Sequence, residues 1–184
     1  MPRHLTKSEL HAGLPDVLAS PKDNGELLGI VVRPEKGQRV EPDSVAVSFA
    51  GGLEGDHWAK GCWKSTEDGQ PHPDVQVCIM NARCIGLIAQ ERSNWAPAGD
   101  NFFLDMDLSE DNLAPGQRLA LGSAVLEITA EPHAGCKSFV ERYGREAGAF
   151  VNSREGKRLR LRGIYARVVQ DGTVSLGDKA VKLA

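Results

Sequence analysis

The segment 131–139, EPHAGCKSF, places a cysteine three residues after a histidine and directly before a lysine. The apolar spacing of residues 137–144 predicts a helix that begins at or just after Cys136. The thiolate is the reactive and metal-binding form of cysteine, and a helix N-terminus or a cation such as Lys137 favours it. His133 becomes a proton partner if the loop curls back. Two interpretations of Cys136 stay open here: a reactive or ligating thiol, and a packed apolar side chain.

The other cysteines are Cys62, Cys78 and Cys84, and no pair of the four forms a CxxC motif. This spacing argues against a zinc ribbon or a thioredoxin-type centre. Cys78 lies in an apolar run and Cys84 in a short helical pattern, so both are expected in the core. A structural zinc site needs four ligands. The candidates for it are split between two loops: His57, Cys62, His72, His133 and Cys136.

The chain of 184 residues is long enough for one domain with a buried core. A formal net charge of -3 argues against a dedicated nucleic-acid-binding protein, and only residues 154–167 are rich in Lys and Arg. No apolar run approaches the roughly 20 residues that span a bilayer, and the N-terminus carries no apolar stretch typical of a signal peptide. We therefore expect a cytoplasmic protein that binds neither nucleic acid nor membrane.

Short apolar or alternating runs predict about eight strands, beginning with 27–33, 44–50 and 75–80. Hairpin turns are expected at Gly122–Ser123 and Asp171–Gly172. No alternation of strands and helices appears. The pattern predicts a mainly β protein, a mostly antiparallel β-barrel with several short helices.

Two segments stand apart from this pattern. Residues 1–26 form a polar N-terminal extension, with a short helix at best, ahead of a barrel domain at 27–184. Residues 57–74 form a long loop with two tryptophans and no periodicity. Such a loop is usually either functional or disordered.

Four motifs follow one another along the chain: GGLEGD at 51–56, GDN at 99–101, LALGSAVLEITAEPHAGC at 119–136 and GTVSLGDKAVKL at 172–183. Together they resemble the MOSC domain, the C-terminal domain of molybdenum cofactor sulfurases, and the chain looks like a small stand-alone bacterial member. The likeness runs from about residue 27 to the end. It implies a barrel similar to the pyruvate kinase barrel domain, which agrees with the strand pattern.

The signature cysteine of the family falls on Cys136, so the resemblance implies that Cys136 is the catalytic residue. In sulfurases the domain is thought to carry sulfur to the molybdenum cofactor. Here this would mean a persulfide on Cys136, supplied by a separate cysteine desulfurase. In related amidoxime-reducing enzymes the cysteine ligates molybdenum directly. Here that would mean a metal ligand that helps to reduce N-hydroxylated compounds, with a redox partner supplying electrons.

The resemblance also implies a binding site for the molybdenum cofactor, whose pterin phosphate needs cations and backbone donors. RPEKGQR at 33–39 resembles the lysine-bearing loop that contacts this phosphate in the reductases, and Asn101 matches a cofactor-contacting asparagine. The implied binding residues are Lys36, Arg39, Gly55, Asp56, Asp100, Asn101, His133, Lys137, Arg160 and Arg162. For each arginine the alternative is a solvated surface position.

The chain departs from the family pattern at two positions. Many members have a histidine where this chain has Trp58, and Asp100 replaces the usual glutamate. Family descriptions mention pyridoxal phosphate, but no lysine motif here supports its binding. The alternative function is a non-catalytic barrel that binds a pterin or another anion, or docks onto a partner enzyme, with Cys136 merely packed.

Overall fold

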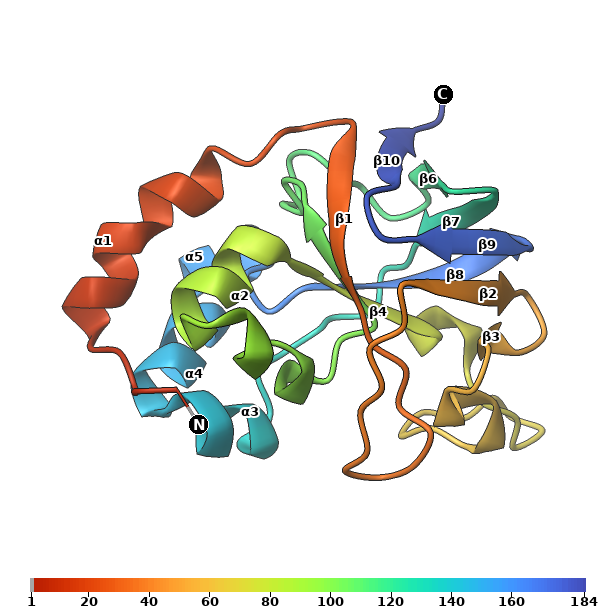
Figure 1. Ribbon diagram of the computed structural model, residues 1–184, viewed down its shortest axis with the longest axis horizontal. Coiled ribbons are helices and arrows are strands. Elements are labelled where there is room, and N and C mark those ends of the chain that lie inside the picture. Colours follow the sequence, from red (N-terminus) through yellow and green to blue (C-terminus); the bar gives the residue numbers. More distant parts are fainter. Residues whose placement is uncertain (1) are drawn as a thin grey trace.

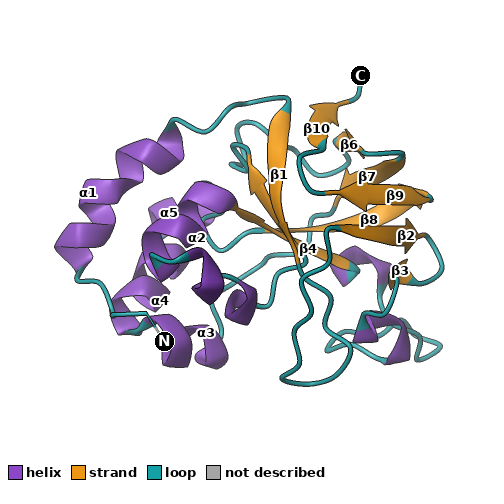
Figure 2. Ribbon diagram, in the orientation of Figure 1, coloured by secondary structure: helices purple, strands orange, loops and turns teal. Residues whose placement is uncertain are grey.

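The computed structural model describes residues 2–184 and shows a mainly β protein with its α-helices gathered on one side (Figures 1 and 2). Seven strands form a closed barrel in the order β1-β10-β6-β7-β8-β4-β5, and β1 pairs with β5 to complete it. Only the β4–β5 pair is parallel. The barrel strands are β1 (Gly25–Ile30), β4 (Val77–Asn81), β5 (Phe102–Asp105), β6 (Arg118–Leu121), β7 (Ala124–Ile128), β8 (Ile164–Gln170) and β10 (Lys179–Lys182).

Alternation along these strands explains the closure, because every second side chain is apolar and points inward. β7 shows this pattern: Ala124, Leu126 and Ile128 are buried, and the residues between them are partly exposed. A separate sheet of β3 (Gly52–Leu53), β2 (Ser44–Ser48) and β9 (Gly172–Ser175) lies beside the barrel. A closed barrel leaves no unpaired edge, so its loops can carry the functional groups.

The helices form a second layer with its own core against the outside of β4 and β5 (Figure 2). Met80 and Phe103 point from these strands into that core. The α-helices are α1 (Lys7–Leu18), α2 (Ala82–Ala89), α3 (Lys137–Tyr143), α4 (Arg145–Asn152) and α5 (Arg154–Arg158). Four short 3-10 helices are η1 (His57–Lys60), η2 (Pro73–Val75), η3 (Arg92–Asn94) and η4 (Ala96–Ala98).

The predicted mostly antiparallel barrel with short helices is confirmed, and two local expectations differ from the structure. Residues 57–74 carry η1, most of η2 and a tight turn, in place of an aperiodic loop. The N-terminal helix has 12 residues, longer than expected, because Thr6 and Glu9 form a reciprocal capping box. None of the helices among residues 2–184 is long and apolar enough to cross a membrane.

Helix α1 packs on the helical core through Leu10, which is fully buried, whereas Leu18 at its last turn is 55% exposed. We predict that Leu10→Ala lowers the free energy of unfolding by about 2–5 kcal/mol, because it leaves a cavity in that core. Leu18→Ala, the matched control on the same helix, should change it by less than about 0.5 kcal/mol. Urea denaturation measures both, and equal effects would contradict the docking of α1.

Candidate functional site

Arg33, just after β1, is held by a buried carboxylate. Its Nε and Nη2 donate to the two carboxylate oxygens of Asp56 at 2.9 and 3.0 Å, and its Nη1 donates to the Gly99 carbonyl at 2.9 Å. Asn101 is fully buried and accepts from Arg33 Nη2 at 3.1 Å while donating to Asp56 at 3.1 Å. Burial opposes the charge of Arg33, yet Cys78 and Asp56 raise its pKa. Arg33 is therefore a fixed cation.

Arg162, between α5 and β8, has an equivalent arrangement. Its Nη1 donates to both oxygens of the fully buried Asp100, at 2.9 and 2.7 Å, and its Nη2 donates to the Ala98 carbonyl at 3.0 Å. The guanidinium lies 4.9 Å from the ring centre of Phe139 in α3. Burial disfavours the charge of Arg162, but the buried carboxylate of Asp100 bonded to it raises its pKa.

Both arginines hydrogen-bond to the chain segment 98–101. Each donates to one backbone carbonyl and to one side chain within it. Gly99 in its centre has φ +92°, a backbone angle that favours glycine. This explains the GDN triplet in physical terms. The glycine makes the turn, and the two polar side chains position the arginines.

A cavity of about 400 Å³ opens in front of both arginines. Its cationic wall contains Arg33, Lys36 and Arg162, while their partners Asp56 and Asp100 are buried. The arginine–aspartate dipoles therefore turn their positive ends to the cavity, which favours an anionic ligand. The remaining lining residues are His57, Trp58, Gly61, Cys62, Trp63, Val75, Cys78, Gly99, His133 and Tyr165.

His133 belongs to the loop that ends at Cys136, and its side chain is only 7% exposed. Its ring centre lies 4.4 Å from that of Tyr165, and its Nδ1 is 3.7 Å from Asp100 and has no hydrogen-bond partner. Burial, with the nearby charges of Arg162 and Arg33, holds the pKa of His133 well below its ordinary value. His133 is therefore neutral at pH 7 and keeps one ring nitrogen available.

Cys136 precedes α3 directly, and its side chain caps no backbone group. Asn152 from α4 pins the preceding residue, because its side chain accepts from Gly135 N at 2.9 Å and donates to Gly135 O at 3.0 Å. Of the cysteines, all of which lie in the described part of the chain, only Cys136 is exposed. The loop therefore presents an accessible thiol. His133, three residues earlier in the sequence, lines the cavity, whereas Cys136 is not among the lining residues.

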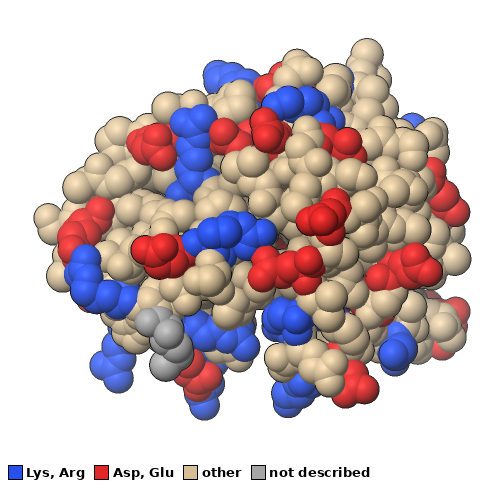
Figure 3. All heavy atoms as spheres, in the orientation of Figure 1, with Lys and Arg blue, Asp and Glu red and all other residues tan. Residues whose placement is uncertain are grey.

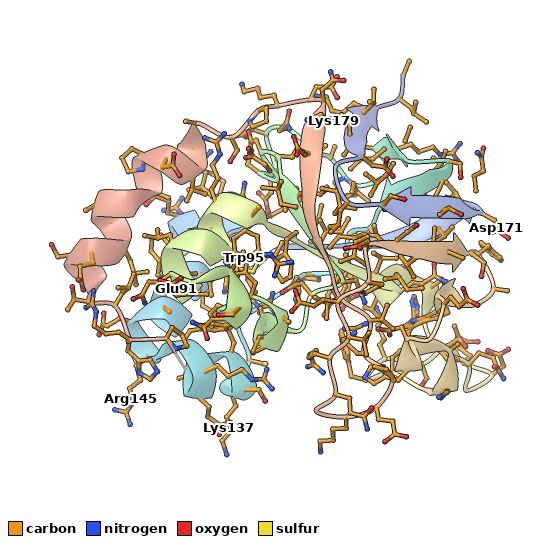
Figure 4. All side chains as sticks on the ribbon, in the orientation of Figure 1. Glu91, Trp95, Lys137, Arg145, Asp171 and Lys179 are labelled. Carbon is orange, nitrogen blue, oxygen red and sulfur yellow. The ribbon has the colours of Figure 1, made fainter. Side chains whose placement is uncertain are left out.

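The structure gathers some of the predicted site residues and separates others. Lys36, His133 and Arg162 line the same cavity, and the half-buried Arg39 lies close to its Gly99 rim. Asp56, Asp100 and Asn101 lie behind it and hold the arginines. Gly55 lies apart in a surface groove with β2, and Lys137 points into solvent (Figure 4). Arg160 bonds the Leu113 carbonyl and, together with His133, lines a second cavity of about 390 Å³. Their predicted contacts with a cofactor stay predictions.

Sequence reasoning missed four residues of the site: Arg33, Trp63, Cys78 and Tyr165. Cys78 was expected in the core and is buried there, but its sulfur also lies 3.6 Å from Arg33 Nη1 and lines the cavity. Arg33 carries a signal, since it opens the same RPEKGQR segment as Lys36. Tyr165 and Trp63 carry none, because only the tertiary fold brings β8 next to the 57–74 segment.

The described residues offer no ligand cluster for the structural zinc site considered from the sequence. Across residues 2–184, no three His, Cys, Asp or Glu side chains are grouped so that they could hold a metal ion. His57 and Cys62 line the cavity, but His72 caps η2 by accepting from Asp74 N at 3.2 Å.

The surface in Figure 3 mixes charges of both signs, and its lower edge is notched between the helical side and the loop after β1 (Figures 1 and 3).

A family model identifies the family, and solved structures support the fold. The MOSC domain family model matches residues 53–181. The YUAD protein from Bacillus subtilis has 21% sequence identity and a TM-score of 0.60, over 85% of this chain and 93% of that one. YiiM from Escherichia coli has 17% identity and a TM-score of 0.55, over 86% of this chain and 70% of that one. At such identities these likenesses show the fold alone. No curated protein sequence matches the chain significantly.

The pair of Arg162 and Asp100 gives the first prediction from the site. Asp100→Ala should lower the free energy of unfolding by about 3–5 kcal/mol, because it leaves the guanidinium buried without its counter-charge. Adding Arg162→Met to that variant should recover part of the loss, since the buried charge is then gone. Chemical denaturation of the three proteins measures this. Additive losses in the double variant would contradict a coupled pair.

His133 gives a prediction about pH. Its pKa in the folded protein lies below the unfolded value of about 6.5, so the unfolded chain binds the proton first as the pH falls. The free energy of unfolding should therefore decrease below about pH 6.5, by at most about 1.4 kcal/mol per pH unit from this group. His133→Phe keeps a ring against Tyr165 but cannot titrate. Denaturation from pH 7 to 5 should show a shallower decrease in this variant, and identical slopes would contradict the assignment.

Proposed function

The chain belongs to the MOSC domain family, and on that premise we propose that it binds the molybdenum cofactor in the cavity lined by Arg33, Lys36 and Arg162, with Cys136 as a thiolate ligand of the metal. The observation that carries this proposal is the pairing of a fixed cationic wall with an exposed thiol on an adjoining loop. When bound, the cofactor would supply a molybdenum centre that exchanges electrons and oxygen with an N-hydroxylated substrate. We expect the protein to act in the cytoplasm.

The residues present fit such a group. A pterin phosphate is a dianion, which Lys36 can bind through charge-assisted hydrogen bonds. The donors of Arg33 are taken by protein acceptors, so Arg33 contributes positive potential, and Arg162 keeps its Nε without a partner. Arg33 and Arg162 stay in place without a ligand because their own carboxylates hold them, so binding costs little side-chain entropy. Lys36 is exposed and free to close onto the phosphate. The buried Nε of Arg162 and Nδ1 of His133 have no partner in the protein, as expected where a ligand supplies one.

The chain's own residues would then do three things. The arginines orient the anionic cofactor, and Trp58 and Tyr165 exclude water from one side of it. Cys136 offers a soft thiolate, the type of ligand that molybdenum takes in the reductase relatives. His133 is neutral and buried, so it can hold or pass a proton at the ring nitrogen that lacks a partner.

A second candidate is the sulfur carrier, and the exposure of Cys136 favours it. The Cys136 thiolate would attack the outer sulfur of a desulfurase persulfide. The sulfur–sulfur bond of the desulfurase breaks, its cysteine leaves as a thiolate, and Cys136 becomes the persulfide. This step needs an accessible thiol and no enclosed cavity.

Molybdenum content and intact mass decide between the two. The protein is purified from cells with active molybdenum cofactor synthesis, next to Cys136→Ser and the neighbouring control Ser138→Ala. We predict near-stoichiometric molybdenum in the wild type and the control, and a loss of at least about tenfold in Cys136→Ser, as expected for a lost metal ligand. A mass gain of one sulfur atom without molybdenum, absent from Cys136→Ser, would favour the carrier. Full molybdenum content in Cys136→Ser would contradict the ligand role.

A further inference from the structure

Trp63 lines the cavity and directly precedes a small, hydrogen-bonded hairpin. His72 N donates to Lys64 O at 3.0 Å, and a bridge pairs Ser65 with Pro71, so residues 64–72 form a small hairpin. An ion pair between Lys64 and Glu131 ties this hairpin to the loop that ends at Cys136. The tryptophan is therefore presented in a fixed place relative to the thiol loop.

Trp63 is 67% exposed, the most exposed of the large apolar residues in the described chain. A single exposed apolar side chain is common and by itself means little. This one, however, begins a row of rings that continues into the cavity. The ring centres of Trp63 and Tyr165 are 6.4 Å apart, and those of Tyr165 and His133 are 4.4 Å apart. Together the three rings form an aromatic wall, and all three line the cavity.

The aromatic wall belongs to the same cavity as the cationic wall of Arg33, Lys36 and Arg162. Aromatic side chains bind flat rings by stacking, and cationic donors bind polar or anionic groups attached to such rings. A saturated, puckered ring of the same size gains the apolar contact but loses most of the stacking. The cavity therefore distinguishes ligands by flatness as well as by charge.

We propose that Trp63 is a specificity-determining residue that stacks on a flat aromatic or heteroaromatic ring of the substrate, in the cavity that His133 of the thiol loop also lines. This assigns the substrate class of the proposed site and so rests on the proposed function: N-hydroxylated compounds that carry a flat ring. Trp63 is 67% exposed whereas Arg162 is buried, so the indole lies at the solvent side of the cavity, where a substrate can reach it. The pterin of the cofactor is the other flat ring that could use the same wall, and the test separates the two.

The test uses two amidoximes of equal carbon number, benzamidoxime and cyclohexanecarboxamidoxime, which differ in the flatness of the ring. Reduction of each amidoxime to the amidine and water, with two electrons supplied by a reduced viologen dye, is measured with wild-type protein, Trp63→Ala and Trp63→Phe, each checked for molybdenum content. We expect Trp63→Ala to keep its molybdenum and to raise KM for benzamidoxime about tenfold, with little change for the cyclohexane compound. Trp63→Phe should recover most of the loss, because it restores a ring.

Each other outcome overturns the proposal. Loss of molybdenum in Trp63→Ala would mean that the wall stacks on the cofactor instead. Equal changes in KM for both compounds would mean that flatness is not recognised. Equilibrium dialysis of the two amidoximes against metal-free protein runs in parallel and needs no cofactor. Wild-type protein should bind the flat compound more tightly than the cyclohexane compound, and Trp63→Ala should remove this difference. If the purified wild-type protein holds no molybdenum, only the proposed function is contradicted. If wild-type protein binds the two compounds equally in dialysis, the inference about Trp63 is contradicted.

Discussion

The site depends on the burial of two guanidinium groups. Arg33 and Arg162 lose most of their hydration, which is affordable only because Asp56 and Asp100 bond them directly. These carboxylates in turn need a fixed backbone. Asp100 has it in the segment 98–101, which turns at Gly99 and runs into β5, and Asp56 has it at the start of η1, where its side chain accepts from Trp58 N. The result is a cationic wall that exists before any ligand arrives. A preformed site of this kind binds an anion without the entropy cost of ordering its own side chains.

The fold supplies the rigidity that this arrangement requires. β1, β4 and β5 are neighbours in the closed barrel, so Arg33, Cys78 and Asn101 meet where these strands begin or end. The helical layer fixes the other half of the site. Phe139 in α3 packs on Arg162, and Asn152 in α4 bonds Gly135, so the loop with Cys136 is tied to both helices. The 64–72 hairpin is tied to the same loop through Lys64, which joins three distant parts of the sequence around one cavity.

Much of the fold was predictable from the sequence, because its strands alternate and its turns carry the expected residues. Alternation along residues 124–128 and the glycine turn before them predict a hairpin without further information. The parallel pairing of β4 with β5 was not predictable, since it depends on a crossover that local patterns do not encode. The site followed the same division. The thiol loop and Lys36 stand out by residue type, whereas Tyr165 and Cys78 resemble ordinary strand residues. Asp100 and Asn101 stand out as motif residues, but only the structure shows that they hold arginines.

The central claim is that Cys136 and the arginine-lined cavity form one site for the molybdenum cofactor. X-ray absorption at the molybdenum edge tests it most directly, because the fit counts the sulfur atoms bound to the metal. The account predicts one sulfur ligand more in the wild-type protein than in the small fraction of Cys136→Ser that still carries the metal. It also predicts that Arg33→Ala lowers the molybdenum content without changing that count in the protein still loaded. An identical sulfur count in wild type and Cys136→Ser would contradict the claim, since the thiol would then lie outside the metal's coordination shell.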